Sequence, residues 1–246
     1  MSDSKRVAFI TGANRGIGLQ TARELGARGY TVVLGVRDPG AGEAAVVELR
    51  KANIDAQAIP YDATRPDTDE QVRSYFDKKY GRLDVLVNNA GITREQLFGK
   101  QNASTVPIDV VRETFETNVF AVIRLTQTLL PLIEAAPAGR IVNLSSILGS
   151  LGLHAAKDSP IGPAKAFAYN ASKTALNAFT VHLANELAGT SVKVNSAHPG
   201  WVQTELGGPG APMPLDQGAK TSVRLATLDA SGPSGGFFHE ADALPW

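Results

Sequence analysis

Short apolar segments rich in β-branched residues alternate along the chain with longer segments whose apolar residues recur at helical spacing. This alternation predicts an α/β fold in which a parallel sheet carries helices on both faces. The apolar segments are continuous, so we expect the strands to be covered on both sides. Strands are expected at residues 7–11, 31–36, 56–61, 85–88, 140–144, 192–197 and 236–238, and helices at residues 17–28, 42–51, 69–80, 109–135 and 168–187.

Three segments fit neither pattern. Residues 93–107 and the Gly- and Pro-rich residues 207–214 are expected to be loops near a site, the second of them a mobile lid. Residues 151–166 form an irregular insert. Because no repeat or linker divides the chain, we expect one domain over residues 1–246. Its dinucleotide-binding half would span about residues 1–145, and its catalytic and substrate-binding half, not a separate domain, about residues 146–246.

The first predicted strand leads through TGANRGIG into the first predicted helix. Glycines in this context allow the backbone to approach a pyrophosphate, and the helix N-terminus offers unpaired N–H groups. The turn therefore predicts a dinucleotide site, with the alternative that it is only a connection between strand and helix. The candidate binding residues of the turn are Gly12, Asn14, Arg15, Gly16, Ile17 and Gly18.

The end of the second strand indicates which dinucleotide is bound. NAD sites usually carry an acidic residue there for the ribose hydroxyls, whereas this chain carries Val36 and then Arg37. An arginine can hydrogen-bond a 2'-phosphate bidentately, and Arg15 adds a second cation. NADPH or NADP+ is therefore expected in preference to NADH. Two alternatives stay open: both arginines are solvated surface residues, or Asp38 binds the ribose.

Composition narrows the function classes. Because 24 basic and 24 acidic residues cancel, nothing in the charge points to nucleic acid or an anionic membrane as partner. No segment approaches the roughly 20 apolar residues that cross a bilayer, and the first apolar run breaks at Thr11 and Gly12, too early for a signal peptide. The chain has no cysteine and its four histidines lack metal-ligand spacing, so we expect no metal. A cytoplasmic location is expected.

A second motif, YNASK, lies in the last long predicted helix. Tyr169 and Lys173 stand at i and i+4, so they share a helical face and the ammonium can approach the phenol. A nearby cation lowers a phenol pKa from about 10 and so favours proton donation near neutral pH. By itself, however, this pair is common on helix surfaces.

Taken together, the motifs resemble those of the short-chain dehydrogenase/reductase superfamily, over a match that runs from Val7 to about Phe238. Their order and spacing both agree with the family. The resemblance implies a Rossmann-type, doubly wound sheet of about seven parallel strands. The motifs are TGANRGIG, Asp62 after the third strand, NNAG at residues 88–91, Asn118, NLSS at residues 143–146, YNASK at residues 169–173 and PGWVQT at residues 199–204.

The resemblance implies four catalytic residues. Tyr169 would protonate a carbonyl oxygen as the nicotinamide hydride attacks the carbon, and Ser146, rather than Ser145, would hydrogen-bond that oxygen. Lys173 would bind the nicotinamide ribose and lower the tyrosine pKa. Asn118 would hold a water that links Lys173 to solvent, which is chemically reasonable because an amide in an otherwise apolar helix needs a partner. The alternative is that Asn118 is a polar residue on a solvated face.

The resemblance also implies the remaining cofactor contacts. Asp62, with the Ala63 backbone beside it, would bind the adenine amino group, and Thr204 would bind the nicotinamide carboxamide. Asn89 would be as much structural as functional. Beyond the glycine turn and Arg37, the implied cofactor residues are Asp62, Ala63, Asn89, Ala90, Gly91, Tyr169, Lys173, Pro199, Gly200, Val202 and Thr204.

The insert at residues 151–166 sets this chain apart from most members it resembles. Ser146 and Tyr169 are 23 positions apart, farther than is common in the family. The insert resembles that of the carbonyl reductase branch, which includes monomeric members whose extra residues cover a dimerisation surface. We therefore expect a monomer or dimer in preference to a tetramer. His154, within the insert, is a weaker candidate for a substrate contact.

The expected substrate pocket is largely apolar. It would be walled by residues 92–97, 147–153 and 207–214, with Ser146, Ile147 and Trp201 as candidate substrate contacts, although Trp201 could serve packing alone. These walls predict a hydrophobic small-molecule aldehyde, ketone or enone. Our leading hypothesis is an NADPH-dependent carbonyl reductase that works reversibly as an alcohol dehydrogenase. The alternatives are a reductase of a conjugated C=C or an imine, and a non-catalytic NADP(H)-binding sensor.

Overall fold

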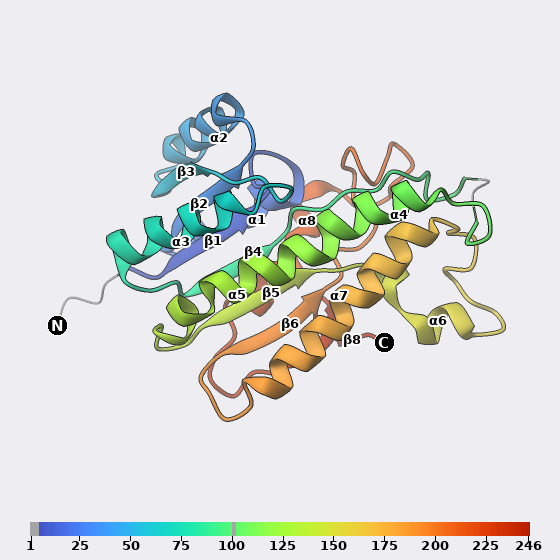
Figure 1. The fold of residues 1–246 in the computed structure, drawn as a ribbon. Helices are drawn as coiled ribbons and strands as arrows, with labels where there is room; N and C mark the ends of the chain where they lie inside the picture. Colours follow the sequence, from blue (N-terminus) through green and yellow to red (C-terminus); the bar gives the residue numbers. More distant parts are fainter. Residues whose placement is uncertain (1–4, 100–101) are drawn as a thin grey trace.

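The structure, a computed structural model, describes residues 5–99 and 102–246. Its strands form one sheet in the order β3-β2-β1-β4-β5-β6-β7-β8 (Figure 1). All neighbours from β3 to β7 pair in parallel, and β7 and β8 pair antiparallel. The strands are β1 (Val7–Thr11), β2 (Thr31–Val36), β3 (Ala56–Pro60), β4 (Val85–Asn88), β5 (Arg140–Leu144), β6 (Lys193–Ala197), β7 (Phe237–His239) and β8 (Asp242–Ala243).

The predicted doubly wound α/β fold is confirmed, with one addition. Seven strands match the predicted ones, whereas the two-residue β8 was not expected because a short polar segment carries no strand pattern. The helical segments are α1 (Gly16–Ala27), α2 (Pro39–Lys51), α3 (Asp67–Tyr80), α4 (Ile108–Phe115), η1 (Glu116–Phe120), α5 (Ala121–Glu134), η2 (Ile147–Gly149), α6 (Leu151–Ala155), α7 (Phe167–Glu186), α8 (Leu215–Gly218) and α9 (Lys220–Ala226).

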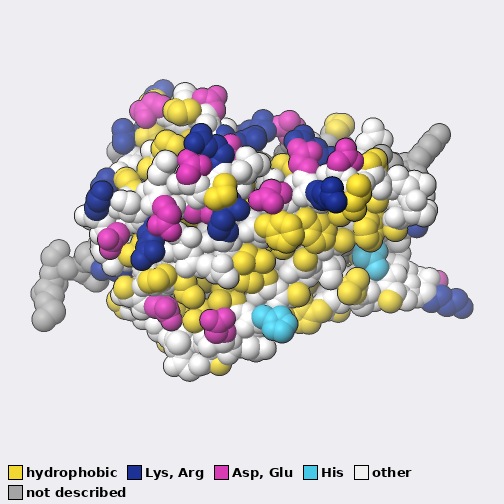
Figure 2. Space-filling model, in the orientation of Figure 1, with side chains coloured by type: hydrophobic (Ala, Val, Ile, Leu, Met, Phe, Trp, Pro, Cys, Tyr) yellow, Lys and Arg dark blue, Asp and Glu magenta, His cyan; other side chains and the backbone are white. Residues whose placement is uncertain are grey.

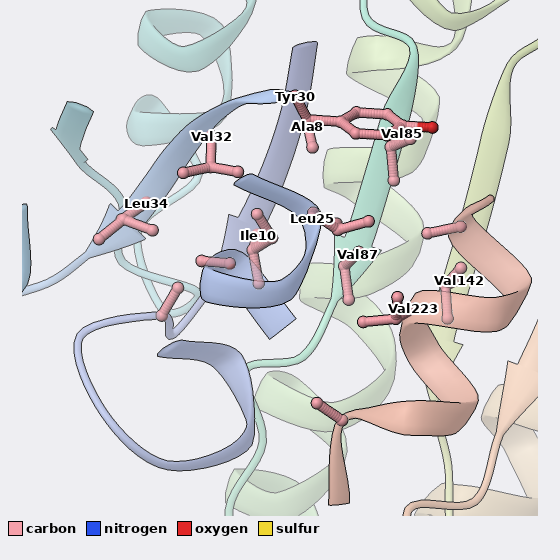
Figure 3. Packing of buried hydrophobic residues seen from close by; sticks show 14 of the residues in the cluster. Ala8, Ile10, Leu25, Tyr30, Val32, Leu34, Val85, Val87, Val142 and Val223 are labelled. Atoms are coloured by element: carbon pink, nitrogen blue, oxygen red, sulfur yellow. The ribbon is translucent and has the colours of Figure 1, made fainter. Parts of the chain in front are cut away.

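Each face of the sheet is covered by its own set of helices. Ala8 and Ile10 of β1 pack on one face, in a cluster with residues of α1, α2 and α9 (Figure 3). Val7 and Phe9, the alternate residues of the same strand, pack on the other face with residues of α3, α5 and α7. Because successive side chains of a strand point to opposite faces, a strand buried on both sides must be continuously apolar. This explains why the strands could be recognised in the sequence.

The helix predicted at residues 109–135 is not continuous. It consists of α4, the π-helical turn η1 and α5 in direct succession. A π-turn inserts one residue into an α-helix and is often found at functional sites. Apolar spacing alone could not reveal it, because one extra residue barely disturbs a helical pattern of this length.

The irregular segments are more ordered than the sequence suggested. The insert begins with the short helix α6, and residues 207–214 fold back so that Met213 forms a bridge with Val202. Of the predicted loop at residues 93–107, residues 100–101 lie outside the described residues. No helix in the described part of the chain is long and apolar enough to cross a membrane.

Candidate active site

Four predicted catalytic side chains come together beyond the carboxyl ends of the central strands. Ser146 follows β5, Tyr169 and Lys173 lie on α7, and Asn118 lies in η1. All four are buried. The carboxyl edge of a parallel sheet, near the point where the strand order reverses between β1 and β4, is where such folds bind ligands. The structure therefore gathers the predicted catalytic residues at the expected edge.

The ammonium of Lys173 lies beside the aromatic ring of Tyr169. Lys173 Nζ is 5.6 Å from the ring centroid, and it donates a 2.8 Å hydrogen bond to the carbonyl oxygen of Leu144. Burial raises the pKa of Tyr169 to about 12, while a side-chain hydrogen bond with Ser146 lowers it. Burial also lowers the pKa of Lys173 to about 8. The pKa of Tyr169 therefore lies above the ordinary value of a phenol and not below it as expected, because desolvation outweighs the hydrogen bond with Ser146.

Ser146 lies in a turn packed closely against α7. Its hydroxyl accepts a 3.2 Å hydrogen bond from the N–H of Leu148 and so caps η2. At Gly149, the end of η2, a Cβ would lie only 2.8 Å from Lys173 Cβ, so only glycine permits this approach. Gly149 was not among the predicted residues, although a glycine directly after NLSSIL was a visible signal. It sets the spacing between the Ser146 turn and α7.

Asn118 is a fully engaged buried amide. Its Oδ1 accepts a 2.8 Å hydrogen bond from the N–H of Ile92. Its Nδ2 donates to the carbonyl of Ile92 at 2.9 Å and to Ser172 Oγ at 3.0 Å. The alternative of a solvated face is wrong, since Asn118 is 1% exposed. A Cβ at the neighbouring Gly91 would lie 3.3 Å from Asn118 Oδ1 and 3.5 Å from Lys173 Nζ, so these three residues adjoin.

The glycine turn has the shape needed to receive a pyrophosphate. Gly12 and Gly16 have φ values of 63° and 58°, which other residues rarely adopt. A Cβ at Gly18 would lie 2.6 Å from Asn89 Nδ2, and Asn89 itself donates to the carbonyl of Thr11 at 2.7 Å. No side chain caps α1, so its first-turn N–H groups are available to an anion. The backbone of the turn thus leaves room for a dinucleotide, and the individual roles of Asn14 and Ile17 stay predictions.

The two predicted cations differ in their surroundings. Arg37 is exposed just after β2, next to the strand that carries the glycine turn. Arg15 is also exposed and pairs with Glu205 at 2.5 Å. Asp38 caps α2: its Oδ1 accepts hydrogen bonds from the N–H groups of Gly40 at 2.8 Å and Ala41 at 3.3 Å. A carboxylate with this structural role is a poor candidate for a ribose ligand.

The other predicted cofactor residues also take part in the framework. Asp62 Oδ1 accepts hydrogen bonds from the N–H and the hydroxyl of Thr64, and the carbonyl of Ala63 accepts one from Arg124 at 2.9 Å. The N–H of Ala90 donates to Thr11 Oγ1 at 3.0 Å. Thr204 Oγ1 accepts a hydrogen bond from the N–H of Gly207 at 3.0 Å. Their cofactor roles remain predictions.

The segment after β6 carries the predicted substrate contact Trp201. Its indole N–H donates to the carbonyl of Gly207 at 2.8 Å, and its ring lies 5.3 Å from that of Phe98. Gly200, after Pro199, has a φ of 90°, and Val202 packs close to Gly218. Phe98 was missed by sequence reasoning because a lone aromatic residue in a loop has no pattern.

Two further residues near the site were missed or under-used. His198 Nδ1 accepts a 3.2 Å hydrogen bond from the N–H of Ile147, directly after Ser146. Burial, with a smaller effect of His239, lowers the His198 pKa to about 3, so the ring stays neutral and can accept. Glu95 is buried and accepts a hydrogen bond from the backbone N–H of Tyr169. His154 hydrogen-bonds the carbonyl of Leu148. Within residues 5–99 and 102–246, no group of acidic or histidine residues could hold a metal ion.

A doubly wound sheet with a phosphate-binding glycine turn, and with a serine, a tyrosine and a lysine at its carboxyl edge, defines the class of dinucleotide-dependent oxidoreductases. The family model described as short chain dehydrogenase matches residues 6–212. The chain therefore belongs to the short-chain dehydrogenase family.

Known relatives agree with this assignment. "Carbonyl reductase [NADPH] 1" of Mus musculus is 33% identical, over 100% of both chains. "Short-chain dehydrogenase/reductase 1" of Saponaria officinalis is 31% identical over 98% of this chain and 96% of its own. An NADPH-bound carbonyl reductase from chicken fatty liver superposes with a TM-score of 0.84 at 26% identity, covering 98% of this chain and 99% of its own. The resemblance to the carbonyl reductase branch is confirmed.

Proposed function

We propose that the protein is an NADPH-dependent reductase of small-molecule carbonyl compounds. The observation that carries this proposal is the convergence of Ser146, Tyr169 and Lys173 at the carboxyl edge of the sheet, on the same side as the glycine turn. Relatives named for NADPH and carbonyl reduction support it. NADPH, when bound, supplies the hydride that reduces the carbonyl carbon.

The residues of the site divide the remaining work. Ser146 donates a hydrogen bond to the carbonyl oxygen and positions it. Tyr169 gives its phenolic proton to that oxygen; burial, which raises the pKa of the phenol to about 12, keeps it in the protonated form that can act as the donor. Lys173 would hold the nicotinamide ribose, and its proton can replace the one lost by Tyr169. Asn118, joined to Ile92 and Ser172, keeps η1 and α7 in register.

Cofactor selectivity rests on the residues around the second strand. Arg37 and Arg15 are exposed cations, and Asp38 is engaged in capping α2. A 2'-phosphate would pair with Arg37 and compete with Glu205 for Arg15, whereas the Asp38 carboxylate is already engaged through its Oδ1. Asp62, Ala63 and Thr204 are proposed to bind the adenine and the carboxamide.

The substrate is proposed to be an apolar aldehyde or ketone. Trp201 and Phe98 present aromatic surface, with 40% and 58% of their area exposed, and Ile147 follows the catalytic serine. Aromatic and aliphatic walls with few polar groups favour an apolar ligand. Reduction of a conjugated C=C or an imine is the second candidate, although an intact Ser146 and Tyr169 favour a carbonyl.

The test is oxidation of NADPH in the presence of a panel of apolar aldehydes, ketones, enones and imines. The Tyr169→Phe variant should lose at least about a hundredfold of its turnover and still bind NADPH, measured by calorimetry. Tyr80→Phe, at the end of α3, is the matched control and should stay active. If Tyr169→Phe leaves all NADPH-linked behaviour unchanged, the non-catalytic sensor becomes the better hypothesis.

The state of assembly and the location are also proposals. Figure 2 shows hydrophobic side chains gathered over α4, α5 and α7, and exposed large ones there include Ile108, Phe120 and Phe167. Exposed apolar patches often mark interaction surfaces, so this face supports a dimer within the monomer-or-dimer expectation. Light scattering would decide between them. A cytoplasmic location remains a prediction.

A further inference from the structure

The catalytic helix α7 has no capping side chain of its own. Its N-cap residue is Ala166, which makes no side-chain hydrogen bond. The first N–H groups of an α-helix lack intrahelical acceptors, and Tyr169, the third residue of α7, is buried. A buried N–H without an acceptor would be unfavourable. The beginning of the helix that carries the proton donor therefore needs a partner from elsewhere in the chain.

Glu95 supplies that partner from a loop 74 positions away. Its Oε2 accepts a 3.0 Å hydrogen bond from the backbone N–H of Tyr169. Glu95 is only 6% exposed and forms no ion pair with a basic residue of the described part of the chain, and so complete a burial is rare for an unpaired carboxylate. Its other oxygen, Oε1, is buried and has no hydrogen-bond partner among the described residues. The partial positive charge at the N-terminus of α7 is favourable for a carboxylate in this position.

The loop around Glu95 is fastened to the same end of α7. Thr93 Oγ1 donates to the carbonyl of Glu95 at 3.0 Å and accepts from its N–H at 3.2 Å, which fixes the local turn. Two residues further on, the carbonyl of Leu97 accepts a 3.0 Å hydrogen bond from the N–H of Lys165. Next along the loop, Phe98 contacts Trp201. One short segment thus joins the proposed substrate wall to the start of the catalytic helix.

We propose that Glu95 is a positioning residue for the reaction, because its carboxylate holds the backbone of Tyr169 and thereby fixes the phenol relative to Ser146. This inference rests on the proposed reductase function. Glu95 contacts the backbone of Tyr169 and not the reacting atoms. Its hydrogen bond sets where the first turn of α7 lies, and misplacement of a catalytic group lowers the rate of the chemical step rather than the affinity for the cofactor.

The kinetic test compares two substitutions that separate the hydrogen bond from the charge. Glu95→Gln keeps an oxygen of the same reach, so it should retain at least half of the kcat. Glu95→Asp keeps the charge but is one methylene too short to reach the N–H, so its kcat should fall about tenfold, with the KM for NADPH within about twofold of the wild-type value. Glu113→Ala is the matched control, because Glu113 pairs with exposed Arg94 in the same region and should behave as wild type.

A second measurement does not depend on turnover. Hydrogen exchange followed by mass spectrometry should be faster at the Tyr169 amide in Glu95→Asp, and unchanged in Glu95→Gln and Glu113→Ala. Equal kcat values and equal exchange in all variants would overturn the proposal, and so would a more active Glu95→Asp than Glu95→Gln. If the wild type turns over no substrate while the exchange pattern is as expected, the proposed reductase function fails and the contact between Glu95 and Tyr169 stands.

Discussion

The Lys173 ammonium lies 5.6 Å from the centre of the Tyr169 ring, and its hydrogen bond goes to the carbonyl of Leu144, not to the phenol. Both groups are buried, and burial favours the neutral form of each. The phenol of Tyr169 is thus kept protonated. The Lys173 amine, with a pKa of about 8, is still mostly charged at neutral pH although burial disfavours its charge.

Replacing Lys173 should stabilise the fold while it removes activity. The Lys173 pKa is lowered to about 8 from its ordinary 10.5, so the buried ammonium opposes folding most strongly below pH 8, and this effect disappears as pH rises above the ordinary value. Lys173→Met should therefore gain on the order of 2 kcal/mol in unfolding free energy near neutral pH and less in alkaline solution. Chemical denaturation at several pH values measures the gain. A variant less stable than wild type at neutral pH would contradict the argument.

Alkaline unfolding should accompany ionisation of the tyrosines. Burial raises the pKa of all five tyrosines, those at positions 30, 61, 75, 80 and 169. In the unfolded chain they ionise near about pH 10. Above that pH the unfolded state binds fewer protons than the folded state, so stability falls as pH rises. Tyrosinate absorbance and circular dichroism should change together, and tyrosinate in the intact fold below about pH 10 would argue against this burial.

Asp38 should matter for stability and not for the cofactor. Its carboxylate accepts from the Gly40 and Ala41 N–H groups at the start of α2, and loss of such a cap usually costs about 1 kcal/mol. Asp38→Ala should lower the unfolding free energy by that amount, with the KM for NADPH and for NADH unchanged. Asp38→Asn, which can still cap, should be near wild type. A selective rise in the KM for NADH would instead restore Asp38 as a ribose ligand.

Arg37 should discriminate between the two nicotinamide cofactors. A hydrogen bond to a charged phosphate contributes about 1.5–3 kcal/mol, so Arg37→Ala should weaken NADPH binding about tenfold to a hundredfold and leave NADH binding unchanged. Arg23→Ala provides the control, because it also removes a surface arginine, one that pairs with the exposed Glu48. Calorimetry with both cofactors measures the difference. Equal weakening of NADPH and NADH would remove the phosphate argument.

Much of the fold could be predicted from the sequence because its strands are buried on both faces. The bounds of β1, β2, β4 and β5 agree with the continuous apolar segments. The helix expected from residue 42 begins at Pro39, and Asp38 followed by Pro39 at the first helical position is the sequence signal for that start. The strand β8 could not be predicted from the sequence, because its two exposed residues form a strand only by pairing with the edge of β7.

The identities of the site residues could be predicted from sequence motifs, whereas the properties that depend on contacts between distant segments could not. The positions of Ser146, Tyr169 and Lys173 followed from motif order. The burial of Glu95 depends on the start of α7, and the tyrosine pKa depends on how completely the site is desolvated. Neither property has a local signature, because both arise from chain segments that meet only after folding. Tertiary context therefore decides the electrostatics of the site even when its residues are known in advance.

The π-turn η1 makes one stretch of this protein sensitive to length as well as to residue type. The π-turn accommodates one additional residue between α4 and α5, and an α-helix rotates by about 100° per residue, so deleting one residue from Glu116–Phe120 would either remove the bulge that carries Asn118 or rotate α4 relative to α5. Asn118 would then lose its alignment with Ile92, or α5 its contact with the sheet. A single-residue deletion in η1 would therefore separate the site from its scaffold without changing any side chain that lines the site.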